Sequence, residues 1–145
     1  MLLVATGGYP EVELAKSAKL EIEDGIKVNE RLETNDPSIF AAGDCASFCH
    51  NGVLLRLESV GNAINQGQTV ALNNVGKEII FNAKPWFWSD QFDQKLQIAG
   101  LCDGFTEIIE RKVKDKVSFW YFKNEMLIAV DSFNDPHSYM IGRRL

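Results

Sequence analysis

The chain has 145 residues, of which 46% are hydrophobic and 24% charged, an ordinary composition for one compact domain or two small ones. Its net charge of -5 argues against nucleic acid as a partner, and no apolar run approaches the roughly 18 residues that a membrane span needs. Residues 1–76 carry five basic and ten acidic groups, whereas residues 77–145 carry ten of each. The second half is therefore the better candidate for meeting an acidic partner.

Two short strands are predicted near the start of the chain. Residues 2–5 form an apolar run that stops at Gly7 and Gly8, and residues 24–28 resemble an Asp-Gly turn that leads into a strand. The first of these runs has no upstream partner in the sequence, which is unusual for a strand.

A strand followed by a glycine and an aspartate is the most informative feature of the first half. Residues 39–42 are predicted to form a buried strand, entered through a polar turn that contains Pro37. The strand ends in Gly43 and Asp44, which places a carboxylate at the carboxyl edge of a sheet, where open α/β sheets bind ligands. Gly43 lets a ligand approach the backbone, and Asp44 can accept hydrogen bonds from sugar hydroxyls. A plain Gly-Asp turn is the alternative.

Cysteine and histidine residues follow this motif directly. Cys45, Cys49 and His50 are spaced C-x3-C-H, whereas covalent haem attachment normally needs C-x-x-C-H. A zinc site would need a fourth ligand, which Cys102 or His137 would have to supply. Small, partly buried cysteines in a loop are the favoured interpretation. Because three cysteines are an odd number at irregular spacing, they predict no disulfide framework and favour the cytoplasm.

A helix is predicted from Ser59 to Gly76, with Ser59 as its cap and Gly76 at its end. Its first turn carries free N–H groups and a partial positive charge, so the Val60 and Gly61 amides can face an electron-rich carbonyl. A helix simply packed on a sheet is the alternative. The expected buried face consists of apolar and small residues at three- and four-residue spacing: Val60, Ala63, Ile64, Gly67, Val70, Ala71 and Val75.

The remaining residues predict an antiparallel meander, after a boundary near residues 77–84. Trp86 and Trp88 in an extended segment point to one side and Phe87 to the other, either to flank a planar cofactor or to form an aromatic cluster. Strands are expected at residues 96–101, 106–111, 117–122 and 126–133. A final helix is expected with Asn134 or Asp135 as its cap, Pro136 in its first turn, and Met140, Ile141 and Leu145 on its apolar side.

Together these segments resemble a known family. "TNDPSIFAAGDCA" is similar to the second FAD-binding motif of the pyridine nucleotide–disulfide oxidoreductase superfamily. "RLESVGNAINQGQTVA" and "PWFWSDQFDQKLQIAGL" narrow the likeness to the ferredoxin-reductase-like branch, which includes putidaredoxin and rubredoxin reductases. "LLVATGGYP" is similar to the strand that closes the family's NAD-binding domain. The likeness covers essentially the whole chain.

The resemblance implies an α+β fold in two parts. Residues 1–77 would be the C-terminal segment of an FAD-binding α/β domain, and residues 78–145 the reductase C-terminal domain, an antiparallel sheet with a helix. Gly43 and Asp44 would bind the ribityl and phosphate region of FAD. Glu58, Ser59 and Val60, at the start of the predicted helix, would lie beside the isoalloxazine ring. Trp88, with Trp86, would lie near the flavin where an iron–sulfur partner docks.

The activity implied is that of the parent enzyme, which passes a hydride from NAD(P)H to FAD and then single electrons to a ferredoxin or rubredoxin. The G-x-G-x-x-G segment and NAD-binding domain of such a reductase do not occur in this sequence. The chain is therefore expected to be a C-terminal portion, inactive by itself. Its His137 stands in "DPHSYM" and not in the family's dithiol signature, which makes dithiol chemistry unexpected. The alternative is a non-catalytic dimerisation or interaction module, with a homodimer or strand-exchanged oligomer as its form.

Overall fold

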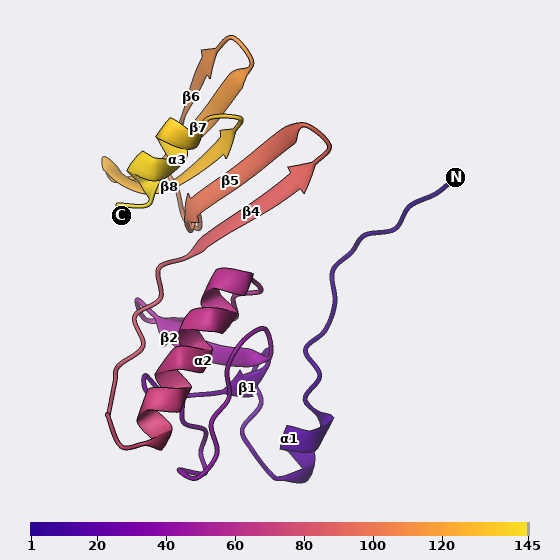
Figure 1. Ribbon diagram of the computed structural model, residues 1–145, viewed down its shortest axis with the longest axis vertical. Coiled ribbons are helices and arrows are strands. Elements are labelled where there is room, and N and C mark those ends of the chain that lie inside the picture. Colours follow the sequence, from indigo (N-terminus) through magenta and orange to yellow (C-terminus); the bar gives the residue numbers. More distant parts are fainter. Residues whose placement is uncertain (145) are drawn as a thin grey trace. The chain divides into compact units, whose positions relative to one another are not determined.

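The computed structural model describes residues 1–144, and the chain divides into two compact units, Met1–Ala83 and Lys84–Leu145 (Figure 1). The domain boundary expected between residues 77 and 78 stays a prediction. In the described part of the chain, no helix has the length and apolar character to cross a membrane. Each unit is built around its own sheet.

The first unit contains a three-stranded sheet in the order β1 (Ile26–Lys27), β2 (Ala46–His50) and β3 (Val53–Leu55). β1 is parallel to β2, and β2 turns back antiparallel into β3. The unit also contains two helices, the short α1 (Glu13–Ser17) and the long α2 (Val60–Asn74), whose Val70 packs against the core. The strand predicted after the Asp-Gly turn is confirmed as β1. The core comprises the buried residues Val28, Leu32, Ala41, Ala46, Phe48 and Ala83.

Two of the predicted strands are wrong. Residues 2–5 form no strand: Leu2 and Leu3 are 88% and 82% exposed, and no strand of residues 1–144 pairs with them. An apolar run becomes a strand only where a neighbour accepts and donates the ladder hydrogen bonds. Residues 39–42 form only an isolated bridge between Phe40 and Glu33. The ladder with β1 begins at Ala46, so Gly43 and Asp44 precede a strand instead of ending one.

The position of strand β2 also differs from the loop that was expected to hold the cysteines. Cys49 was expected in a loop but lies within β2, opposite Leu54 of β3, with its side chain exposed. Cys45 is the residue before this strand, and its thiol donates to the carbonyl oxygen of Ala42 at 3.6 Å. All three cysteines, Cys102 included, are free thiols.

Helix α2 begins and ends as predicted, but its predicted apolar face is only partly buried: Val70 packs against the core. The Ser59 hydroxyl accepts a hydrogen bond from the Asn62 amide, and Gly76 follows the helix with a φ of +79°. Val60, Ile64 and Val75 are between 54% and 72% exposed. Spacing identifies an apolar stripe, whereas the direction in which the helix meets its sheet decides which stripe is buried. The buried residues are Gly61, Asn62, Gln66 and Thr69.

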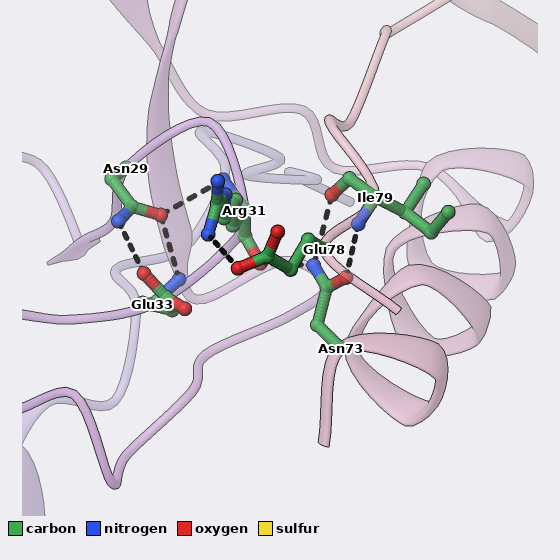
Figure 2. Close-up of polar contacts among 6 residues, drawn as sticks. All are labelled: Asn29, Arg31, Glu33, Asn73, Glu78 and Ile79. Atoms are coloured by element: carbon green, nitrogen blue, oxygen red, sulfur yellow. Dashed lines mark hydrogen bonds and ion pairs between the residues drawn. The ribbon is translucent and has the colours of Figure 1, made fainter. Parts of the chain in front are cut away.

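The end of α2 is tied to two loops by one side chain, Asn73 (Figure 2). Its amide nitrogen donates to the carbonyl oxygens of Arg31 and Ile79 at 2.8 and 2.9 Å, and its oxygen accepts from the Ile79 amide at 2.6 Å. The Arg31 guanidinium also pairs with the Glu78 carboxylate at 3.1 Å. These contacts hold residues 78–81, after the helix, against the loop at residues 30–31.

The second unit is an antiparallel sheet in the order β4-β5-β8-β7-β6, covered by helix α3 (Figure 1). Its four expected strands are confirmed, and the tryptophan segment adds a fifth at the edge. Two serines, Ser118 and Ser132, are buried in this sheet. The Ser118 hydroxyl accepts from the Trp120 indole N–H, and the Ser132 hydroxyl donates to the Gln97 carbonyl. The bounds are β4 Trp86–Gln91, β5 Gln94–Gly100, β6 Glu107–Val113, β7 Lys116–Lys123, β8 Met126–Phe133 and α3 Pro136–Gly142.

Helix α3 starts as predicted, with Asp135 as its cap and Pro136 in its first turn. Its expected apolar side is wrong, because Met140 and Ile141 are 59% and 37% exposed. The helix instead buries Ser138, Tyr139 and Gly142. A Cβ at Gly142 would lie only 3.0–3.1 Å from the side chains of Val130 and Ala99, so a small residue lets the helix approach the sheet closely. Leu145 lies outside the described residues.

The Asp135 cap predicts a pH dependence of stability. Its carboxylate is 3% exposed, accepts from the Ser138 hydroxyl at 2.6 Å, and lies 3.1 Å from the Arg111 guanidinium. The Ser138 hydrogen bond is the main reason why the pKa of Asp135 lies below its ordinary value. A lowered folded-state pKa stabilises the fold above the unfolded value of about 3.9, and this stability is lost as the pH falls through the folded pKa.

We therefore expect Asp135→Asn to lower the free energy of unfolding of the second unit by about 1–2 kcal/mol at pH 7. The difference between the two proteins should shrink below about pH 4. Urea unfolding followed by tryptophan fluorescence measures this, because all three tryptophans lie in the second unit. The matched control is Asp115→Asn in an exposed turn, expected to stay within about 0.5 kcal/mol. A difference that persists unchanged at pH 3 would contradict the role of the charge.

Candidate functional site

The Gly43-Asp44 turn is held in place through its backbone. The Gly43 amide donates to the side-chain oxygen of Gln66 at 2.7 Å, and its carbonyl accepts from the Ala46 amide at 3.0 Å. The Asp44 carbonyl accepts from a guanidinium nitrogen of Arg56 at 2.9 Å. Gly43 is buried with a φ of +83°, a conformation that glycine adopts without strain, whereas Asp44 is exposed. The turn thus fixes a backbone while leaving a carboxylate accessible.

Arg56 connects three segments around this turn. Its Nε donates to the Asp24 carbonyl at 2.7 Å, and the same guanidinium pairs with the carboxylates of Glu58 and Asp24. The side chain is only 11% exposed. The hydrogen bond to Glu58 raises the pKa of Arg56 above its ordinary value, against the opposing effect of burial. Arg56 therefore acts as a permanent cation that ties the Asp24 turn, Asp44 and Glu58 together.

Arg56 was missed as a site residue in the sequence. One signal could have revealed it: Arg56 and Glu58 are two residues apart in the extended segment before α2, so their side chains leave the backbone on the same side. The contacts with Asp24 and Asp44 could not have been found in this way, because they join residues 32 and 12 positions apart.

An open cavity of about 230 Å³ lies at this turn, lined by residues 8–11 together with Asp44, Cys45, Arg56 and Glu58. Three acidic residues, Glu11, Asp44 and Glu58, and one arginine, Arg56, line this cavity. This charge pattern suits a ligand that presents hydroxyl donors better than one that presents bare phosphate. Among the described residues, no hydrogen bond engages the carboxylate oxygens of Asp44, which are available as acceptors.

The start of α2 supplies donors in the same unit. The Ser59 hydroxyl satisfies the Asn62 amide at 3.2 Å, so the amides of Val60 and Gly61 are the first N–H groups without an acceptor inside the helix. Val60 is 57% exposed, and the helix dipole adds partial positive charge at this end. Of the predicted residues, Asp44 and Glu58 line the cavity; Gly43 is the residue before Asp44, and Ser59 and Val60 follow Glu58 in sequence. Their role in binding a flavin stays a prediction.

Trp88 belongs to the second unit, on β4. The rings of Trp86 and Trp88 stack at 5.3 Å with an angle of 20° between planes, which confirms that both point to one side of the strand. The Arg143 guanidinium lies 4.5 Å from the Trp86 ring centroid, a cation–π contact. Trp88 is 39% exposed, which leaves an aromatic face available. Its role near a flavin stays a prediction.

Two family models match different parts of the chain. The family model described as "Pyridine nucleotide-disulphide oxidoreductase" matches residues 1–67, and the one described as "Reductase C-terminal" matches residues 86–145. The chain is 38% identical to putidaredoxin reductase of Pseudomonas putida over 94% of its own length and 33% of that protein. It is also 38% identical to rhodocoxin reductase of Rhodococcus erythropolis over 99% of this chain and 35% of that one.

Solved structures show the same likeness. The ferredoxin reductase for the CYP199A2 system from Rhodopseudomonas palustris has a TM-score of 0.92 and 39% identity, covering 97% of this chain and 36% of that one. The putidaredoxin reductase of a covalent complex with putidaredoxin has a TM-score of 0.87 and 37% identity. The match covers 94% of this chain and 34% of that one. Residues 1–67 are thus similar to the pyridine nucleotide–disulphide oxidoreductase family, and residues 86–145 to the C-terminal domain of reductases. The chain is similar to reductases of the ferredoxin-reductase type and spans about a third of the length of the curated relatives it matches.

Proposed function

We propose that this chain forms part of an FAD-dependent NAD(P)H:ferredoxin or rubredoxin reductase. The observation that carries the proposal is the Gly43-Asp44 turn, held by Gln66 and Arg56 beside a cavity whose carboxylates suit hydroxyl donors. The ribityl chain of FAD is such a polyol. A volume of about 230 Å³ accommodates a part of FAD and not all of it, which agrees with a chain that supplies one side of the flavin site.

The residues of the chain have distinct tasks in this proposal. The exposed carboxylate of Asp44 accepts hydrogen bonds from ribityl hydroxyls, and Gly43 keeps the backbone free of a side chain there. Glu58, Ser59 and Val60 lie at the start of α2, where unpaired amides stabilise negative charge on the pyrimidine edge of the flavin. Trp88 supplies an aromatic face that excludes water. When bound, FAD supplies the two-electron and one-electron redox chemistry, with NAD(P)H as the hydride donor.

The partner in this proposal is an iron–sulfur protein of the ferredoxin or rubredoxin type. Relatives of the chain are named for putidaredoxin and rubredoxin, and one solved relative is a complex with putidaredoxin. Basic residues of the second unit would meet an acidic partner: Lys95, Lys112, Lys114, Lys116, Arg143 and Arg144. We place the reaction in the cytoplasm, which the free thiols Cys45, Cys49 and Cys102 support.

Titration of the purified chain with FAD tests the proposal. We expect FAD to bind and to co-elute with the chain on a sizing column, with no NADH-dependent dye reduction, because no nicotinamide site is proposed in these residues. Asp44→Asn is expected to weaken binding about tenfold, since it removes the charge that strengthens hydrogen bonds from the hydroxyls. Asp36→Asn, in a turn of the same unit where its oxygen accepts from the Ser38 amide, is the matched control. Absence of binding by the wild-type chain would overturn the proposal for this chain.

A non-catalytic dimerisation module is the second candidate function. Strand β6 is an edge of the five-stranded sheet, all seven of its residues are exposed, and three of them are apolar: Ile108, Ile109 and Val113. Such an edge can pair with the same strand of a second copy. Sedimentation distinguishes the candidates, because a stable dimer without FAD affinity favours the module and a flavin-binding monomer excludes it.

A further inference from the structure

Gln66 is the polar residue of α2 that reaches the ligand-facing turn. It is fully buried, with 0% exposure, and its side-chain oxygen accepts from the Gly43 amide at 2.7 Å. The orientation of the amide follows from this contact, because an N–H donor must face the carbonyl oxygen of the glutamine. Its Nε2 has no hydrogen-bond partner in the described part of the chain.

The other buried polar side chains of α2 behave differently. The Asn62 amide nitrogen donates to the Leu57 carbonyl at 3.1 Å, and the Thr69 hydroxyl donates to the Asn65 carbonyl at 3.0 Å. Both satisfy backbone groups of the helix or of the segment that enters it. Gln66 alone among these three leaves a buried donor unpaired, which destabilises a fold. A methionine would fill the same space without a donor to satisfy, but it would leave the Gly43 amide without its acceptor.

We propose that Gln66 is a positioning residue that fixes the Gly43-Asp44 turn from the helix side, and so aims the Asp44 carboxylate at the flavin. This inference rests on the proposed function. The turn is held at two points by side chains distant in sequence, Gln66 at the amide of Gly43 and Arg56 at the carbonyl of Asp44. Two such anchors on adjacent residues restrict the rotation of the peptide between them. The Asp44 side chain, which carries no hydrogen bond of its own among residues 1–144, takes its direction from this backbone.

Amide hydrogen exchange of the ¹⁵N-labelled full chain tests the positioning role without FAD. In Gln66→Met we expect the Gly43 amide to exchange about tenfold faster, because its acceptor is lost, while amides of β2 keep their rates. Thr69→Val is the matched control: it removes another buried polar group of α2 and should leave Gly43 unchanged. An unchanged Gly43 rate in Gln66→Met overturns the inference. A uniform rise of the exchange rates across the first unit also overturns it, since that result shows a merely structural role.

The FAD titration provides a second readout. Gln66→Met is expected to raise the Kd about tenfold, and Thr69→Val to leave it within about twofold. Gln66→Glu retains an acceptor oxygen and is expected to restore both the Gly43 protection and the affinity at pH 5, where a buried carboxyl is protonated. If Gly43 loosens in Gln66→Met but the Kd does not change, the positioning role is overturned. If the wild-type chain binds no FAD, the proposed function fails for this chain, and the Gly43 exchange still decides whether Gln66 fixes the turn.

Discussion

Arg56→Met is expected to lower the free energy of unfolding of the first unit by about 1–3 kcal/mol and to weaken FAD binding at least tenfold. The substitution removes the donor to the carbonyls of Asp24 and Asp44, and leaves the carboxylates of Glu58 and Asp24 without their cation. Glu58 and Asp24 are 51% and 70% exposed, so solvent screens part of the loss and keeps the stability effect below that of a fully buried pair.

The first unit contains no tryptophan, so its unfolding is best followed by amide resonances during urea titration. Tryptophan fluorescence of the same samples reports the second unit and should not change. Arg31→Met is the matched control, because its ion pair with Glu78 in Figure 2 is exposed on both sides and should contribute less than about 0.5 kcal/mol. Equal effects of the two substitutions would show that Arg56 is an ordinary surface charge.

Gly100→Ala is expected to destabilise the second unit by about 3 kcal/mol or more. Gly100 ends β5 with a φ of +82°, and a Cβ there would lie 2.1 Å from the Ile128 carbonyl oxygen and 2.9 Å from the Ala129 Cα. These are backbone atoms of β8, the central strand of the sheet, so they cannot rotate away. The sheet must separate or the chain must change conformation at this position, and either change breaks ladder hydrogen bonds.

Thermal unfolding followed by tryptophan fluorescence measures this effect. Gly104→Ala is the matched control, with a similar φ of +74° but with only the flexible end of Lys123 nearby, at 3.1 Å. It should cost about 1 kcal/mol from backbone strain alone. A loss in Gly100→Ala no larger than that in Gly104→Ala would show that the close approach between β5 and β8 is absent in solution.

The sequence by itself determined the local features of this protein. Met126–Phe133 is predictable as a strand with these bounds, because turn residues precede it and an apolar run begins it. The Ser59 and Asp135 caps were likewise predictable, since a cap bonds a backbone amide three residues away. The Gly43-Asp44 motif was recognisable for the same reason: its chemistry is carried by adjacent residues.

Only the tertiary structure decided which strands pair, which helix faces are buried and what holds the site. Residues 39–42 satisfy a strand pattern, yet the ladder with β1 forms at Ala46, because pairing depends on a neighbour 20 residues away. The buried face of α2 contains Gln66 instead of Ile64, because the side-chain oxygen of Gln66 accepts from the Gly43 amide and this contact offsets part of the cost of burying a polar group. Arg56 and Gln66 became part of the candidate site through contacts that span 12 to 32 residues, a range that no local pattern in the sequence specifies.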